Sequence, residues 1–147
     1  MKHRTAIPII RLRRNLLVSI QIELSDQLVD RLKADVSQLI RESEVHGLVI
    51  EVSGVDVFDS YIARSIRDLA RIAHLLVVTT VLAGLDPGMA MTLVEMGMYM
   101  DGVHTALDLS DALAWLESAE QEWTRLSVEL LDELDAPSPS AAAARDD

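Results

Sequence analysis

Asp59 and Ser60 are the residues whose types and position best suit chemistry. They follow an apolar, β-branched run at residues 48–52, which is typical of a strand buried on both faces. Ser60 is then followed by apolar residues with helical spacing: Ile62, Ile66, Leu69, Ala70 and Ala73. Ser60 is therefore predicted to lie where a helix begins. Its hydroxyl can cap that helix, or it can carry a phosphoryl group at the positive end of the helix dipole.

Two further groups of residues accompany this pair. Asp56 stands three residues before Asp59. The two carboxylates suggest either an acid–base pair or a hydrophilic loop whose charges suit a helix N-terminus, and the second interpretation is favoured for Asp56. The stretch from Gly84 to Gly88 follows the next apolar run and is a loop by its residue types. Pro87 suits the first position of the helix that comes after it.

Enzyme signatures are missing from the sequence. It contains no G-x-x-x-x-G-K-[ST] phosphate loop, no G-x-G-x-x-G fingerprint and no G-x-S-x-G nucleophile elbow. The four histidines are scattered, and no pair has the helical spacing of metal ligands: His3, His46, His74 and His104. We therefore expect a protein that is not an enzyme and has no catalytic residue, metal site or cofactor.

The composition bounds the class of protein. A chain of 147 residues has the usual size of one domain. Half of the residues are hydrophobic but 3% are aromatic, so the core must be aliphatic. The formal net charge of -11 disfavours nucleic acid and anionic membranes as partners, and no apolar run approaches a membrane span of about 18 residues. The lack of cysteine is consistent with a reducing cytosol, and a cytoplasmic location is expected.

Strand-like and helix-like patterns alternate along the chain. Apolar runs predict strands at residues 7–13, 16–22, 48–52, 75–83 and 103–106, with Asn15 suited to the turn of an initial hairpin. Helical spacing predicts a first helix capped within residues 23–26 and running to about residue 43, and further helices at about residues 60–74, 89–96 and 109–134. The last of these has Leu109–Asp111 as its expected cap. The predicted fold class is α/β, in the order β-β-α-β-α-β-α-β-α, with a mostly parallel mixed sheet.

The expected domain organisation is simple. Residues 1–134 form one domain with an extended last helix, and residues 135–147 form a disordered acidic tail that contains two prolines and a run of alanines.

The parallel strands are expected to bring the polar segments together. Functional loops lie at the carboxyl ends of parallel strands, so Asp59–Ser60, Gly84–Gly88 and residues 23–26 should share one rim. An alternative function is a small α/β enzyme or nucleotide-binding protein that uses Asp59 and Ser60 on this rim. A receiver that takes a phosphate on an aspartate is a further alternative. It requires a lysine at the rim, and neither Lys2 nor Lys33 stands at a predicted strand end.

The sequence resembles the STAS domain family, which sulfate transporters and anti-sigma factor antagonists share. The resemblance rests on the segments VIEVSGVDVFDSYIAR and VLAGLDPGMAMTLVEMG together with the order of elements. The segments IPIIRLRRNLLVSIQIELSDQ and DGVHTALDLSDAL look most like the RsbS-type antagonists, the single-domain scaffold components of the bacterial stressosome. The similarity covers about Ile7 to Leu116.

The resemblance implies a non-catalytic signalling switch. In such antagonists an RsbT-type serine kinase is bound, phosphorylates the serine that follows the aspartate, here Ser60, and is then released; a PP2C-type phosphatase resets the serine. RsbR-type co-antagonists and further copies of the antagonist are the implied assembly partners. The implied kinase-binding residues lie on the predicted rim: Asp59, Ser60, Gly84, Asp86, Pro87 and Gly88.

Two features depart from the family pattern. Co-antagonists often carry a second phosphorylatable threonine before the Gly-Leu/Ile-x-Pro loop, whereas this chain has Ala83. One switch site is therefore expected. The acidic extension after about Glu120 is also longer than the simple antagonist pattern.

Overall fold

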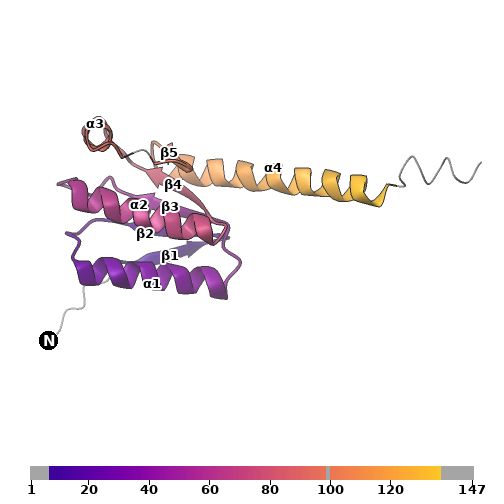
Figure 1. Cartoon of the computed structure of the whole chain (residues 1–147), viewed down its shortest axis with the longest axis horizontal. Coiled ribbons are helices and arrows are strands. Elements are labelled where there is room, and N and C mark those ends of the chain that lie inside the picture. Colours follow the sequence, from indigo (N-terminus) through magenta and orange to yellow (C-terminus); the bar gives the residue numbers. More distant parts are fainter. Residues whose placement is uncertain (1–6, 99, 137–147) are drawn as a thin grey trace, which may run out of the picture. The chain divides into compact units, whose positions relative to one another are not determined.

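Five strands form one mixed sheet, and four helices connect or follow them (Figure 1). The structure, a computed structural model, describes residues 7–98 and 100–136. The strands are β1 (Ile9–Leu12), β2 (Asn15–Ser19), β3 (Gly47–Glu51), β4 (Thr79–Ala83) and β5 (Val103–Ala106). The helices are α1 (Asp26–Glu42), α2 (Ser60–Leu75), α3 (Pro87–Glu95) and α4 (Leu109–Asp135). The predicted order of elements is confirmed.

The strand order in the sheet follows the sequence, β1-β2-β3-β4-β5. β1 pairs antiparallel with β2, and every later neighbour pairs in parallel, as predicted. In the central register Leu17 lies beside Val49, and Val49 lies beside Val81. The loops that follow β2, β3, β4 and β5 consequently leave the sheet at the same edge.

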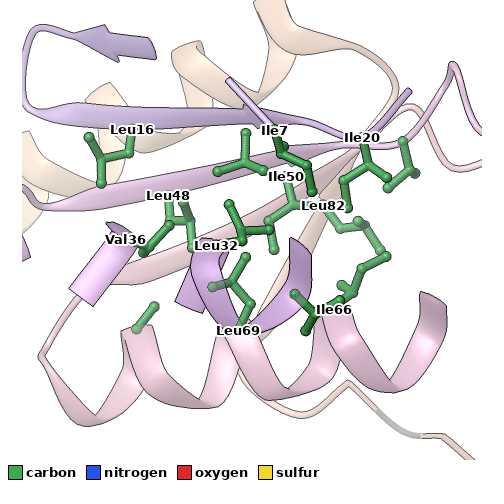
Figure 2. Packing of buried hydrophobic residues seen from close by; sticks show 14 of the residues in the cluster. Ile7, Leu16, Ile20, Leu32, Val36, Leu48, Ile50, Ile66, Leu69 and Leu82 are labelled. Carbon is green, nitrogen blue, oxygen red and sulfur yellow. The ribbon is translucent and has the colours of Figure 1, made fainter. Parts of the chain in front are cut away.

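The larger core lies between one face of the sheet and helices α1 and α2. Figure 2 shows strand residues Leu16, Leu48 and Ile50 pointing toward Leu32 of α1 and Ile66 of α2. These side chains are aliphatic and at most 6% exposed, which agrees with the scarcity of aromatic residues. Burial of each such side chain stabilises the fold by about 1.5–3 kcal/mol, so this core fixes α2 against the sheet.

A smaller core covers the opposite face of the sheet. Leu17, Val49 and Val81 point to this face because side chains alternate along a strand. They pack with Ala112 and Leu116 from the first turns of α4. β3 and β4 are therefore buried on both faces, which the apolar run at residues 48–52 predicted for β3.

The chain divides into two compact units, residues 1–116 and 117–147. The described part of the second unit is the remainder of α4, in which Arg125 pairs with Glu122 at 2.7 Å and with Glu129 at 3.0 Å. The predicted domain over residues 1–134 stays a prediction, and residues 137–147 of the predicted tail lie outside the described residues. No helix within the described ranges is long and apolar enough to cross a membrane.

The strand predicted at residues 75–83 begins only at Thr79. α2 runs on through Leu75 and ends in a left-handed turn, in which Val77 has φ 63°. The Val77 N–H donates to the carbonyl of His74, and the Val78 N–H donates to the carbonyl of Ala73, which is the bonding pattern of a Schellman motif. Leu75 and Val77 belong to this helix end and are 81% and 88% exposed. The prediction that the strand begins at residue 75 is therefore wrong.

Two local predictions near other turns are also wrong. The hairpin turn uses Arg13, with φ 56°, whereas Asn15 is already the first residue of β2. α4 is capped by Asp108, whose Oδ1 accepts a hydrogen bond from the Asp111 N–H at 2.9 Å, and Leu109 is already helical. By contrast, the cap of α1 falls within the predicted segment: Ser25 Oγ accepts from the Leu28 N–H at 3.2 Å.

Candidate functional site

Ser60 is the first residue of α2, and Asp59 is its N-cap. Asp59 has an extended backbone, and its Oδ1 accepts a hydrogen bond from the Ile62 N–H at 2.9 Å. The prediction that Ser60 lies at the helix start is confirmed, but a capping role for its hydroxyl is wrong because Asp59 occupies the cap position. Both side chains are exposed. The Ser60 hydroxyl forms no hydrogen bond with any described residue.

The loop between β4 and α3 depends on a glycine and on a second carboxylate cap. Gly84 has φ +79°, a left-handed conformation that favours glycine. Asp86 caps α3, since its Oδ1 accepts a hydrogen bond from the Met89 N–H at 2.8 Å. Pro87 follows as the first helical residue, as predicted. The loop and the start of α3 are thus set by the order Gly84, Asp86, Pro87.

Gly84 also brings this loop against the loop between β3 and α2. A Cβ on Gly84 would lie 2.6 Å from Glu51 Oε1 and 2.9 Å from Ser53 Cβ, so the two segments approach too closely for a side chain. Glu51 Oε1 accepts a hydrogen bond from the Ser53 N–H at 2.9 Å, which holds the first turn of the β3–α2 loop. Because β3 and β4 pair in parallel, both loops lie on the predicted rim.

A groove opens next to Asp59, between the β2–α1 loop and the β3–α2 loop. Its walls are residues 21–26, 55–57 and 59, with Tyr61 and Ile62 of α2 at its side. The Tyr61 O–H donates to Asp26 Oδ1 at 2.5 Å, and this bond to a carboxylate raises the pKa of Tyr61 to about 12. Residues 23–26 were predicted to lie at this rim. The Tyr61–Asp26 bond was not, because two residues 35 positions apart leave no signal in sequence spacing.

The surface of the rim is acidic and carries an exposed apolar side chain. The exposed carboxylates come from three loops or helix starts: Asp26, Asp56, Asp59 and Asp86. Val57 lies among them and is 71% exposed. Charges of one sign around an apolar contact favour a protein partner with a complementary basic surface.

The described residues offer little for catalysis at this rim. His46 precedes β3, His74 lies in the last turn of α2 and His104 lies within β5, so none is at the start of α2 with Ser60. Lys33 pairs with Asp68 at 3.4 Å, between α1 and α2. No group of three or more histidine, aspartate or glutamate side chains in the described ranges could hold a metal ion. His3 and Lys2 lie outside those ranges.

Comparison with known protein families agrees with this geometry. The family described as the STAS domain matches residues 6–112, which is most of the chain. The chain belongs to the STAS domain family. The matched region of this STAS domain contains the whole sheet, Asp59 and Ser60, and the Gly84–Gly88 loop.

Two solved structures are similar to this chain. A serine-to-glutamate variant of RsbS from Moorella thermoacetica is 34% identical, with a TM-score of 0.70, over 78% of this chain and 97% of its own. A chain from a structure titled as the molecular architecture of the stressosome is 35% identical, with a TM-score of 0.70, over 77% of this chain and 98% of its own. This STAS domain thus has RsbS-like relatives among stressosome proteins, and part of the present chain has no counterpart in them.

A curated relative is a co-antagonist. The RsbT co-antagonist protein RsbRC of Bacillus subtilis is 30% identical over 86 residues, which cover 53% of this chain. The chain spans 30% of the length of that relative. The similarity therefore concerns one part of RsbRC.

Proposed function

We propose that this STAS domain is a non-catalytic antagonist of an anti-sigma pathway, which binds an RsbT-type serine kinase and releases it when Ser60 is phosphorylated. The observation that carries the proposal is the division of roles between Asp59 and Ser60. Asp59 caps α2, and the exposed Ser60 hydroxyl has no hydrogen-bond partner among the described residues. A phosphoryl group can therefore be added to Ser60 without removing a bond that the helix needs.

The position of Ser60 also explains how the phosphoryl group would act. It would add about -1.5 to -2 charges at the first position of α2, where unpaired N–H groups and the helix dipole tolerate an anion. The fold should therefore persist. The same group would stand beside Asp59 on the rim, so a partner packed closely over Ser60 would meet added bulk and the cost of removing water from a phosphate. Release is expected to come from local repulsion.

The proposed kinase surface comprises the two rim segments that meet at Gly84. Its residues belong to the start of α2 and to the β4–α3 loop: Asp59, Ser60, Gly84, Asp86, Pro87 and Gly88. The groove beside Tyr61 extends this surface. Ala83 is fully buried in the smaller core, which agrees with a single acceptor on this rim.

The remaining partners follow from the relatives. The similarity to a chain from a stressosome structure and to the co-antagonist RsbRC supports assembly of this protein with RsbR-type co-antagonist STAS proteins and with further copies of itself. A PP2C-type phosphatase would reset Ser60, and the cytoplasm is the proposed location. The alternative of a small enzyme or nucleotide-binding protein gains nothing from the rim, where no described histidine lies near Ser60.

The test is the intact mass of the full chain after incubation with an RsbT-type kinase and ATP. The wild type should gain one phosphate, Ser60→Ala should gain none, and Ser53→Ala, an exposed serine in the same loop region, should gain one. Ser60→Asp should bind the kinase more weakly than the wild type does. An unmodified wild type in the presence of an active kinase, or a phosphate retained by Ser60→Ala, would refute the proposed switch.

A second measurement tests the local nature of the release. Amide chemical shifts of the phosphorylated and unmodified proteins should differ around residues 56–64 and 84–88 and agree elsewhere. Shifts that change throughout the sheet would contradict release by local repulsion.

A further inference from the structure

The distal part of α4 carries an exposed apolar stripe. Four large side chains recur there at intervals of three or four residues, and each is 41–80% exposed: Trp123, Leu126, Leu130 and Leu134. A helix has 3.6 residues per turn, so this spacing puts all four along one side of α4. These four residues are called the α4 stripe below. Exposed apolar side chains that gather on one face mark a surface for another molecule.

The α4 stripe lies outside the part of the chain that the STAS family matches. That match ends at residue 112, and the stripe belongs to the second compact unit. Helices in proteins gain most of their stability from packing of an apolar face, and a partner would supply that packing here. Residues 137–147 do not offer a substitute, because their sequence contains no apolar side chain larger than alanine or proline.

The charge along this part of α4 selects the kind of partner. Residues 117–135 contain one basic residue, Arg125, which already pairs with Glu122 and Glu129 of the same helix. Glu133 stands three residues after Leu130, at the edge of the stripe. The same range contains seven acidic residues: Glu117, Glu120, Glu122, Glu129, Asp132, Glu133 and Asp135. A partner that covers the stripe meets an excess of negative charge, which basic side chains complement.

This charge disfavours a second copy of the chain as the occupant. Two α4 helices packed through their stripes would bring two sets of seven carboxylates together, with two arginines that are already paired. Helices that pair through an apolar seam are matched by opposite charges on the two sides of that seam. A helix with apolar residues at the same spacing and with lysine or arginine beside them fits α4 in both respects.

We propose that the α4 stripe binds a basic amphipathic helix of another protein. The apolar residues of that helix would pack on Trp123, Leu126 and Leu130, and its basic residues would face the glutamates beside the stripe. Ser60 belongs to the other compact unit, and the inference does not rest on the proposed kinase switch.

Isothermal titration calorimetry of the full chain with synthetic peptides tests the surface. The probe is a heptad-repeat peptide with leucine at the a and d positions and lysine at the flanking e and g positions. The wild type should bind it with a stoichiometry of one. Two control peptides should bind at least about tenfold more weakly: one has glutamate in place of each lysine, and the other has the composition of the probe in an order without an apolar face.

Matched pairs of variants locate the binding on α4. Leu130→Ala should weaken binding of the probe by about tenfold, because it removes apolar surface that the partner would cover. Val128→Ala is its control, since Val128 is also exposed, at 53%, but its place in the helix is off the stripe. Glu133→Gln should weaken binding by up to about fivefold, whereas Asp132→Asn, on the opposite side of α4, should leave it unchanged. Urea unfolding midpoints should stay at the wild-type value in all four variants, because the altered side chains are exposed.

Three results would overturn the proposal. The first is the absence of saturable binding of the lysine peptide, or equal binding of either control peptide. The second is an equal effect of Leu130→Ala and Val128→Ala, which would place the binding elsewhere on the acidic chain. The third is a dimer in sedimentation velocity that Leu130→Ala dissociates and Val128→Ala does not, since a second copy would then occupy the stripe.

Discussion

Replacement of Gly84 by alanine should destabilise this protein more than the same replacement at another left-handed glycine. Gly84 and Gly97 both have positive φ, +79° and +64°. The added Cβ at Gly84 would meet Glu51 and Ser53, whereas at Gly97 it would meet no atom of the described residues within 4 Å. The pair therefore separates backbone strain from the close approach of the two rim loops.

The expected magnitudes follow from these two costs. An alanine in the left-handed region costs about 1–2 kcal/mol, and this applies to both variants. At Gly84 the alanine must also displace Ser53, whose backbone nitrogen would be 3.1 Å from the new Cβ, and such overpacking adds about 1–3 kcal/mol. The gain from a less flexible unfolded chain is common to both and cancels in the comparison. Gly84→Ala should thus lose about 2–5 kcal/mol, and Gly97→Ala about 1–2 kcal/mol.

Urea unfolding followed by far-ultraviolet circular dichroism measures both losses. The midpoint should fall further for Gly84→Ala, with unchanged slopes. Equal midpoints for the two variants would refute the argument that the rim loops are held in contact through Gly84. Loss of kinase binding by Gly84→Ala with full stability would instead assign this glycine directly to recognition.

Three other results are expected from the helix termini and the rim. Val77→Gly should raise the free energy of unfolding by about 1 kcal/mol, because glycine tolerates the φ of 63° at this exposed position, and a lower urea midpoint would contradict this. Asp59→Ala should lower the free energy of unfolding by about 0.5–2 kcal/mol through loss of the α2 cap, whereas Asp59→Asn should retain most of the stability of the wild type. An equal loss of stability in both variants would argue against the hydrogen bond to the helix. The Tyr61 phenol, followed by carbon chemical shifts, should titrate near pH 12 and move back toward 10 in Asp26→Asn. Since this pKa is raised on folding, the contribution of Tyr61 to stability is full below pH 10 and disappears as the pH rises toward 12.

The order of elements could be predicted because hydrophobic periodicity is strong where one face of an element is buried. The continuous apolar runs of β3 and β4 and the helical spacing after Ser60 each correspond to a side of the core. Pro87 correctly predicted the start of α3 because its ring and missing N–H suit the first turn of a helix. The parallel pairing followed from the alternation of strands and helices, and it placed the rim segments at one edge.

The predictions failed where neighbouring residues compete for one structural role. Asp59 and Ser60 can both cap a helix, and sequence alone does not decide which of two adjacent residues has the extended backbone. The end of α2 was missed because Val77, a β-branched residue, occupies the left-handed position after the helix, where glycine is usually found. An apolar run was then extended across a helix end.

The surroundings of Arg67 could not be predicted for a different reason. In the sequence, helical spacing places Arg64, Arg67 and Arg71 opposite the apolar stripe of α2, a pattern that is typical of a solvated face and that also allows pairing with Asp68. The Arg67–Asp68 pair is present, but the half-buried position of Arg67 depends on β4 and on the chain before β5. Helical spacing within α2 contains no information on those segments.

The two tryptophans of the protein both belong to α4, and this gives its fluorescence a simple meaning. Trp115 stacks on His104, with ring centroids 3.7 Å apart, whereas Trp123 is 69% exposed. The chain has no other tryptophan, so the rim contains none. A modification of Ser60 should leave the emission spectrum nearly unchanged. On mixing with a protein that has no tryptophan, a shift in emission would therefore report contact with α4. Intrinsic tryptophan fluorescence would thus distinguish binding at α4 from binding at Ser60.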